Sequence, residues 1–354
     1  MKRVIRLALA GNPNTGKTTL FNAITGARQK VGNYPGVTVE KREGVRSYKG
    51  YDIYVYDLPG IYSLTAYSID EVVARDFIIN EKPDVVVDVL DATNIERNLY
   101  LCVQFQELNV PVIGALNFMD EVRERGIRID EAHLSRIMKM PFLKTVGTQG
   151  AGVEALLDKV IDVVEKKEPL PCAVSYGHEL EDDVNALAAV IAKDALFHQK
   201  YPSRWCAVKL LEKDARADEV LGAHAFSTEV RTLAVKRIAR IEAHFGRDAS
   251  VVVAEQRYGY IHGAAAEAVI RPTLSKETVT EVVDKALLDR VFGFPIFLFI
   301  LWAVFQLTFK LGEYPMAWLE TFFAWMGSLI ATMVPEGLLQ SLLVDGVVAG
   351  VGGV

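Results

Sequence analysis

The stretch that most constrains this 354-residue chain is Gly-Asn-Pro-Asn-Thr-Gly-Lys-Thr at residues 11–18. It follows an apolar run, Val4 to Ala10, and precedes a helix-like segment at residues 19–24. In this setting backbone N–H groups and a helix N-terminus surround a phosphate. Lys17 adds a full positive charge, and Thr18 offers a hydroxyl to magnesium. The candidate nucleotide contacts here are Gly11, Asn12, Pro13, Asn14, Thr15, Gly16, Lys17, Thr18 and Thr19.

Apolar runs of strand length alternate with helical patterns through residue 165. Such alternation predicts an α/β domain, with a mostly parallel sheet and helices on both faces. Ligands then bind at the carboxyl ends of the strands, where the glycine loop lies. We expect residues 29–36 to be a movable loop. Further strands are expected at 37–40, 45–48, 51–56, 84–90, 110–116 and 142–146, and helices at 68–80, 96–108, 131–138 and 152–164.

Two motifs at successive strand ends indicate which nucleotide binds. Asp57-Leu-Pro-Gly60 places a carboxylate where it can hold magnesium and an N–H where it can reach a γ-phosphate. In Asn117-Phe-Met-Asp120 the aspartate can accept hydrogen bonds from the ring N–H and the exocyclic amine of guanine. Adenine would leave that carboxylate unmatched. The order of these motifs predicts a P-loop GTPase that binds GTP and GDP.

A third strand end, Val146-Gly147-Thr148, is less specific. Its backbone groups can contact the base, but a plain turn from strand to helix explains the same residues. Thr38, in Gly-Val-Thr-Val-Glu, has a hydroxyl that can complete the Mg²⁺ shell when the γ-phosphate is present. The Mg²⁺ ligands are therefore expected to be Thr18, Thr38 and Asp57.

The position after Asp-x-x-Gly, often a glutamine that orients the attacking water, is Ile61. Because this side chain cannot hydrogen-bond, intrinsic hydrolysis should be slow, and the group that orients the water is not evident. Asn14 can offer its carbonyl oxygen to a monovalent cation against the phosphates, although a local hydrogen bond within the loop explains it too. The candidate catalytic groups are Asn14, Lys17, Thr38 and Gly60.

The rest of the chain changes character twice. Charged and proline-containing residues 165–171 read as a linker, and the region to 270 shows helical spacing without clear strands. Residues 291–309 then carry no charge and are long enough to cross a bilayer. Residues 314–334 are apolar but contain Glu320, so they either span the membrane or lie at its interface. The chain stops within another apolar stretch, as a fragment of a longer membrane protein would.

Composition excludes other classes. The net charge is −6 and no basic block stands out, which argues against nucleic-acid binding. The three cysteines, Cys102, Cys172 and Cys206, are too widely spaced to indicate a zinc site or a disulfide framework. The N-terminus lacks the pattern of a signal peptide.

Residues 11–18, 31–40, 57–64 and 91–101 resemble the ferrous iron transport protein B family (FeoB) over long, specific motifs. The chain departs from common patterns at two points: no lysine follows Asn117, and no proline lies at 68–70. The resemblance implies a G domain at 1–168, a helical domain that tunes nucleotide affinity at 169–270, and the start of a membrane domain at 271–354 with a transmembrane helix near 291–310.

The same resemblance implies GTP-coupled Fe²⁺ uptake across the cytoplasmic (inner) membrane, with the N-terminal domains in the cytosol. It also implies K⁺-assisted hydrolysis through Asn14. Expected partners are Fe²⁺ as cargo, the bilayer, the missing part of the membrane domain, small cytosolic Feo accessory proteins and further copies of the chain. The alternative is a membrane-tethered regulatory or assembly GTPase that moves no solute.

Overall fold

The structure is a computed structural model that describes residues 3–26, 29–34, 37–65, 68–166, 174–222, 224, 226–271, 283–284, 287–289, 292–335, 337–348 and 350. The chain divides into two compact units, Met1–Ser275 and Lys276–Val354. Several sequence expectations, on residues 167–171, Gly36, Cys172 and Val291, lie outside the described residues.

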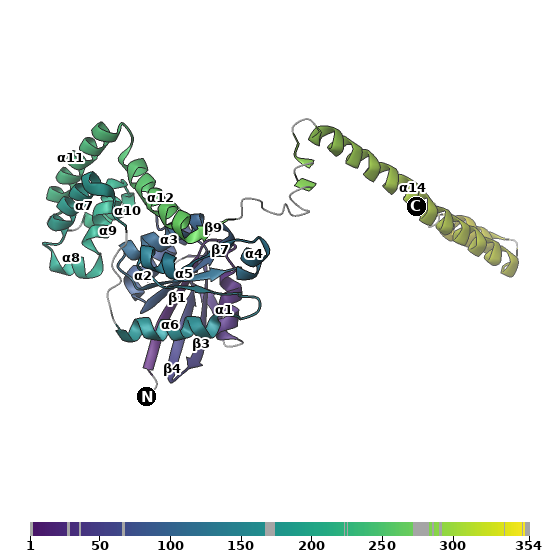
Figure 1. The fold of residues 1–354 in the computed structure, drawn as a ribbon. Helices are drawn as coiled ribbons and strands as arrows, with labels where there is room; N and C mark the ends of the chain where they lie inside the picture. The colour runs from purple at the N-terminus through teal and green to yellow at the C-terminus, as the bar shows by residue number, and fades with distance from the viewer. Residues whose placement is uncertain are drawn as a thin grey trace. The chain divides into compact units, whose positions relative to one another are not determined.

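A seven-stranded sheet forms the centre of the first unit (Figure 1). Its order is β2-β3-β4-β1-β5-β6-β8, and β1 pairs in parallel with both β4 and β5. The predicted, mostly parallel sheet is therefore confirmed. The strands are β1 (Arg3–Gly11), β2 (Gln29–Asn33), β3 (Glu40–Tyr48), β4 (Tyr51–Asp57), β5 (Val85–Asp91), β6 (Val112–Asn117) and β8 (Phe142–Lys144).

Helices cover both faces of this sheet, because successive residues of its central strands are apolar and point alternately to the two faces. Ile5, Leu7 and Leu9 of β1 belong to one buried cluster with residues of α1 (Lys17–Thr25) and α6 (Val153–Lys166). Ala8 and Ala10 face the other cluster. That second cluster includes residues of α2 (Ile69–Glu81), α3 (Ile95–Glu107) and α5 (Glu131–Met138).

The segment between α1 and β4 differs from the prediction. Residues 29–33, expected to be loop, form strand β2, which pairs antiparallel with β3. Residues 37–39, expected to begin a strand, precede β3 and are not part of it. The reason is pairing: the carboxyl half of β3 pairs with β4, and its amino half gives β2 an edge to join. The sequence also gave no sign of α4 (Met119–Glu124), nor of β7 (Arg128–Ile129), which pairs with β9 (Val269–Ile270).

Residues 174–268 are helical, as expected, and lie beside the α2 and α3 face of the sheet (Figure 1). Their buried residues join the same cluster as α2 and α3, so one apolar core runs through both regions. The last helix, α12, packs against α3 and α5. The helices are α7 (Gly177–Ile191), α8 (Ala195–Lys200), α9 (Ser203–Leu211), α10 (Ala215–Leu221), α11 (Ser227–Phe245) and α12 (Ala249–Ala268).

Among its described residues, the second unit contains one long apolar helix, α14 (Gly293–Met333), followed by α15 (Leu338–Ser341) and a π-helical turn, η2 (Leu342–Val348). Two segments were expected, at 291–310 and 314–334, but α14 continues through both with Pro315 inside it. A proline removes one backbone hydrogen bond and need not end a helix whose flanks are strongly apolar. By length and composition α14 can cross a membrane, and its side chains are largely exposed.

Candidate functional site

The glycine loop lies between the end of β1 at Gly11 and the start of α1 at Lys17. Thr15 Oγ1 donates a hydrogen bond to the carbonyl of Asn12 at 3.0 Å, which closes the turn. Gly16 has a φ of 79°, and a Cβ there would clash with Nδ2 of Asn117. Only glycine therefore fits between the loop and the end of β6.

Lys17, the first residue of α1, meets Asp57 at the carboxyl end of β4, with Lys17 Nζ 2.5 Å from Asp57 Oδ1. Asp57 is 6% exposed, and burial raises the pKa of its carboxyl while the Lys17 charge opposes that rise. Asp57 and the exposed Thr18 provide carboxylate and hydroxyl oxygens, the hard donors that Mg²⁺ prefers. The residues present therefore fit a Mg²⁺ ion.

The first candidate switch segment, described at residues 31–34 and 37–39, contains Tyr34, which sequence reasoning missed. Its ring is 6% exposed and meets Phe77 of α2 edge-on, with centroids 6.1 Å apart. Its hydroxyl donates to the Asp57 carbonyl at 3.4 Å, and burial raises the pKa of that hydroxyl. Thr38 is exposed, and no hydrogen bond joins its side chain to another described residue. The one available sequence signal was an aromatic residue inside a polar, glycine-containing loop.

Asn117 joins two nucleotide loops. Its side chain is buried, donates to the carbonyl of Thr15 at 2.9 Å and accepts from the N–H of Gly147 at 2.9 Å. The N–H of Val146 donates to Ala151, also within this turn. These bonds fix the backbone of residues 146–147 against the phosphate loop, and Gly60 lies against Pro13 of the same loop.

Asp120 lies in the first turn of α4, and its Oδ1 is buried with no hydrogen-bond partner among the described residues. Both polar side-chain atoms of Asn12 are in the same condition. A buried polar atom without a partner is costly. Asn12 and Asp120 follow the carboxyl ends of β1 and β6, where a bound ligand can supply the missing bonds. Asp120 can accept from a guanine edge, as the sequence predicts.

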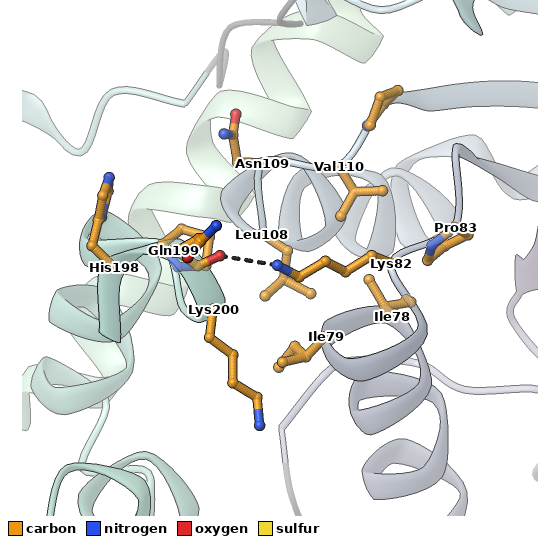
Figure 2. Close-up of a pocket in the computed structure, with 12 residues that line it drawn as sticks. Ile78, Ile79, Lys82, Pro83, Leu108, Asn109, Val110, His198, Gln199 and Lys200 are labelled. Atoms are coloured by element: carbon orange, nitrogen blue, oxygen red, sulfur yellow. Dashed lines mark hydrogen bonds between the residues drawn. The ribbon is translucent and has the colours of Figure 1, made fainter. Parts of the chain in front are cut away.

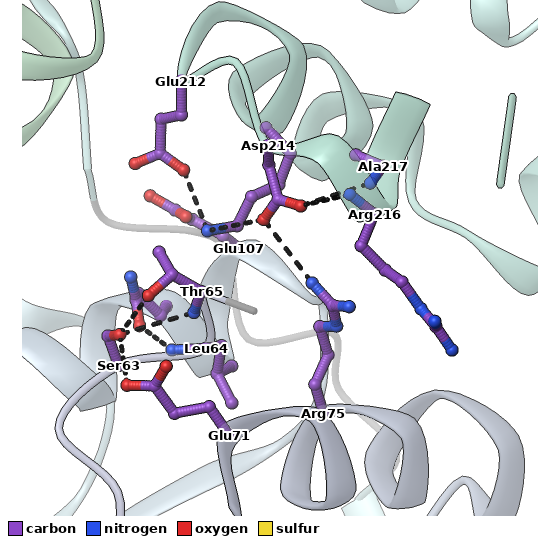
Figure 3. A network of polar contacts seen from close by, with 12 residues as sticks. Ser63, Leu64, Thr65, Glu71, Arg75, Glu107, Glu212, Asp214, Arg216 and Ala217 are labelled. Carbon is purple, nitrogen blue, oxygen red and sulfur yellow. Dashed lines mark hydrogen bonds and ion pairs between the residues drawn. The ribbon is translucent and has the colours of Figure 1, made fainter. Parts of the chain in front are cut away.

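Figure 3 shows how the segment after Gly60 connects to the helical region. The N–H of Leu64 donates to Gln104 Oε1 of α3 at 2.6 Å, and Ser63 Oγ donates to Glu71 of α2 at 2.8 Å. Further along α2, Arg75 reaches Asp214 at 3.5 Å. The second candidate switch segment, described over residues 57–65, is therefore tied by polar contacts to α3 and α2, and α2 in turn contacts the loop before α10.

Deeper in the same interface lies a group of buried charges. Arg257 of α12 is fully buried, contacts Glu107 of α3 at 2.8 Å and pairs with Glu212. Lys209 lies 2.8 Å from Glu212. Burial alone would raise the pKa of Glu212, but Arg257 and Lys209 hold it below the ordinary value. The charges neutralise one another, as buried charges must.

A separate cavity of about 260 Å³ lies between the ends of α2 and α3 and helix α8 (Figure 2). Lys82 Nζ donates across it to the carbonyl of Gln199 at 3.0 Å. Pro83 and Pro111, which line it, precede β5 and β6, so the cavity is at the sheet edge opposite the phosphate loop. It is not part of the nucleotide site.

The sheet topology, the phosphate loop after β1, Asp57 at the end of β4 and the Asn117 to Asp120 motif after β6 define the P-loop GTPase fold. Profiles of "Ferrous iron transport protein B" and of the "FeoB cytosolic helical domain" match residues 5–160 and 176–270. The chain belongs to the ferrous iron transport protein B family.

Similar proteins and solved structures support the same family assignment. A Porphyromonas gingivalis Fe(2+) transport protein A/Fe(2+) transporter FeoB fusion protein is 40% identical over 99% of this chain and 42% of its own length. The apo cytosolic domain of T. maritima FeoB is 34% identical, with a TM-score of 0.65, over 76% of this chain and all of its own. A GDP-bound variant of the S. thermophilus FeoB G-domain is also 34% identical, with a TM-score of 0.68, over 75% of this chain and 100% of its own. The chain spans about half the length of the curated relatives it matches.

Proposed function

We propose that this chain is the GTP-binding and GTP-hydrolysing N-terminal part of a ferrous iron transporter of the cytoplasmic membrane. The observation that carries the nucleotide assignment is the buried, unpartnered Oδ1 of Asp120 next to Asn117, which is fixed on the phosphate loop. The GDP bound to the S. thermophilus G-domain variant supports the same nucleotide class. Iron as cargo is supported by the relatives, which are Fe(2+) transporters.

The Lys17–Asp57 pair suggests how the GTP cycle starts. In the structure Lys17 pairs with Asp57, so an arriving phosphate must draw the lysine toward itself and release the carboxylate. Asp57 and Thr18, joined by Thr38 in the GTP state, would then hold Mg²⁺, which neutralises charge on the phosphates. The N–H of Gly60 would contact the γ-phosphate.

Coupling to transport would pass through the two switch regions. Loss of the γ-phosphate would release Thr38 and Gly60, and the polar contacts of Ser63, Leu64 and Arg75 would carry this change into α3 and the helical region. We propose residues 1–168 as the G domain, 169–270 as the helical domain and 271–354 as the start of the membrane domain. Accessory Feo proteins, further chain copies and the rest of the membrane domain would be the partners.

Iron uptake by the full-length protein tests this proposal. In cells that lack other ferrous uptake, Lys17→Ala should reduce both GTP turnover and Fe²⁺ accumulation at least fivefold, because the phosphates lose their main cation. The exposed Lys193→Ala, on the helical region, serves as the control. Loss of GTP turnover with unchanged uptake would instead support the alternative, a tethered regulatory GTPase that moves no solute.

Potassium dependence is a separate prediction. Ile61 is buried and apolar, so it cannot orient water, and we infer that a K⁺ ion held by Asn14 supplies charge stabilisation. Asn14 is exposed in the phosphate loop with a φ of 66°. GTP hydrolysis by wild type should be about tenfold faster in K⁺ than in Na⁺ buffer, a difference that Asn14→Ala removes. Equal K⁺ stimulation of both proteins would contradict the role of Asn14.

A further inference from the structure

The long apolar helix α14 carries its strongly polar side chains on one face. The charged and amide residues among its 41 residues are Gln306, Lys310, Glu313 and Glu320. Steps of four, three and seven residues separate them, and such steps return to the same side of a helix. A polar stripe therefore runs along an otherwise apolar helix.

Small residues extend this face in both directions. All the alanines of α14, together with Gly327, continue the alternation of three and four residues on both sides of Pro315. The stripe, as we define it, consists of Ala303, Gln306, Lys310, Glu313, Ala317, Glu320, Ala324, Gly327 and Ala331. The three tryptophans of the helix, Trp302, Trp318 and Trp325, all lie off the stripe.

The polar residues of the stripe need partners that α14 itself does not provide. Their four side chains are exposed and have no hydrogen-bond or ion-pair partner among the described residues. The hydroxyls of Thr321, Ser328 and Thr332, by contrast, donate to carbonyls of the same helix at 2.7 Å. Because lipid chains offer no hydrogen bonds, an unpaired polar group is costly wherever it faces them. Protein or water, and not lipid, is therefore the expected surrounding of the stripe.

One end of the stripe is already covered by the chain that follows α14. A Cβ built on Gly327 would be 3.7 Å from Val348 and 3.9 Å from Val344, both in η2. Gln340 of α15 donates to the carbonyl of Ala331 at 3.0 Å. A cavity of about 420 Å³ lies between η2 and this part of α14, and it extends to Glu320. The segment that returns along α14 thus packs on the small residues of the stripe.

We propose that the stripe is the face by which α14 packs inside the membrane domain of the full-length transporter. Further helices of that domain cover the part that η2 leaves open, from Ala303 to Glu320, and bring polar groups to its charged residues. The inference rests on the proposed function, in which residues 271–354 begin the membrane domain. Two Fe(2+) transporters support this occupant, because the chain spans only 42% and 51% of their lengths.

The composition of the stripe suits such packing. Small residues let neighbouring membrane helices approach closely, and polar side chains hydrogen-bond across the contact. A spacing of three and four residues matches the left-handed packing of most membrane helix bundles. The remaining faces, rich in phenylalanine, leucine and tryptophan, are apolar and suit contact with lipid.

Spin labels on the full-length protein in lipid vesicles test which face meets lipid. Single cysteines, each in a cysteine-free background, replace neighbouring residues at nearly equal depth, one on the stripe and one off it. The pairs are Ala303 with Trp302, Ala317 with Trp318, and Ala324 with Trp325. Collisions with oxygen, which concentrates in lipid chains, should be at least about twofold more frequent at the tryptophan position of a pair. Equal or reversed collision rates in all three pairs would overturn the proposal.

Fe²⁺ uptake by the full-length protein tests the packing itself. Ala317→Trp should lower uptake per membrane-inserted protein at least about fivefold, because the added ring does not fit a close helix contact. Leu319→Trp places the same side chain off the stripe, at an exposed position, and should stay within about twofold of wild type. Uptake unchanged by Ala317→Trp, or equal loss in both variants, would contradict the proposal. If the wild type takes up no iron, the proposed function fails, and the spin-label pattern alone decides the stripe.

Discussion

Asp120→Asn should weaken GDP binding by at least about 100-fold and make xanthosine diphosphate the better ligand. The carboxylate of Asp120 can accept from both guanine donors, but an amide presents its own N–H₂ to one of them. Leaving a buried donor or acceptor unmatched costs about 1–3 kcal/mol per group, and repulsion between two donors adds to it. Xanthine carries an oxygen where guanine has its amine, so the new N–H₂ finds an acceptor.

Titration with fluorescent derivatives of GDP and xanthosine diphosphate measures this change of nucleotide preference. Asp130→Asn makes the same chemical change at an exposed aspartate, the N-cap of α5, where asparagine caps almost equally well. It should leave both affinities within about twofold of wild type. GDP affinity retained by Asp120→Asn, or a preference of wild type for ATP, would show that Asp120 does not read guanine.

The largest effect on stability is expected for Arg257→Ala, which should lower the opening free energy of α3 and α12 by about 3–5 kcal/mol. Glu107 is fully buried and Glu212 nearly so, and both pair with this one guanidinium. Removing the guanidinium leaves Glu107 buried without a positive partner and leaves Glu212 with Lys209 alone, the costly way to break a buried ion pair. Amide hydrogen exchange of peptides from the two helices gives the free energy directly.

The matched control is Arg231→Ala, because Arg231 pairs with Asp218 on the surface at 2.7 Å, with both side chains about half exposed. Exposed ion pairs contribute about 0–1 kcal/mol to stability, so the protection of amide hydrogens from exchange should hardly change in this variant. A double variant with Arg257→Met and Glu107→Leu, which keeps Glu212 as the partner of Lys209, should recover much of the loss by replacing charges with apolar volume. Equal destabilisation by the two alanine variants would contradict the buried-pair account.

The sequence was most informative where a function depends on neighbours in the chain. The phosphate loop, Asp57 with Gly60, and Asn117 with Asp120 are short motifs at strand ends, and parallel β-topology brings strand ends to one edge. Alternating apolar runs likewise predicted β4, α2, α3 and α5 to within a residue or two. The prediction was wrong at β2, whose polar sequence forms a strand because β3 offers it a paired edge.

The sequence alone therefore determined the class of fold, the ligand-reading motifs and the apolar character of the two segments that the structure joins in α14. Each of these follows from local spacing, backbone geometry or hydrophobic periodicity. Only the tertiary structure decided that the Tyr34 ring is buried against α2, that Gln104 accepts from the N–H of Leu64, and that Arg257 of the helical region meets Glu107 of α3. These contacts join residues far apart in the chain, and packing and desolvation, which no local pattern records, select the partners.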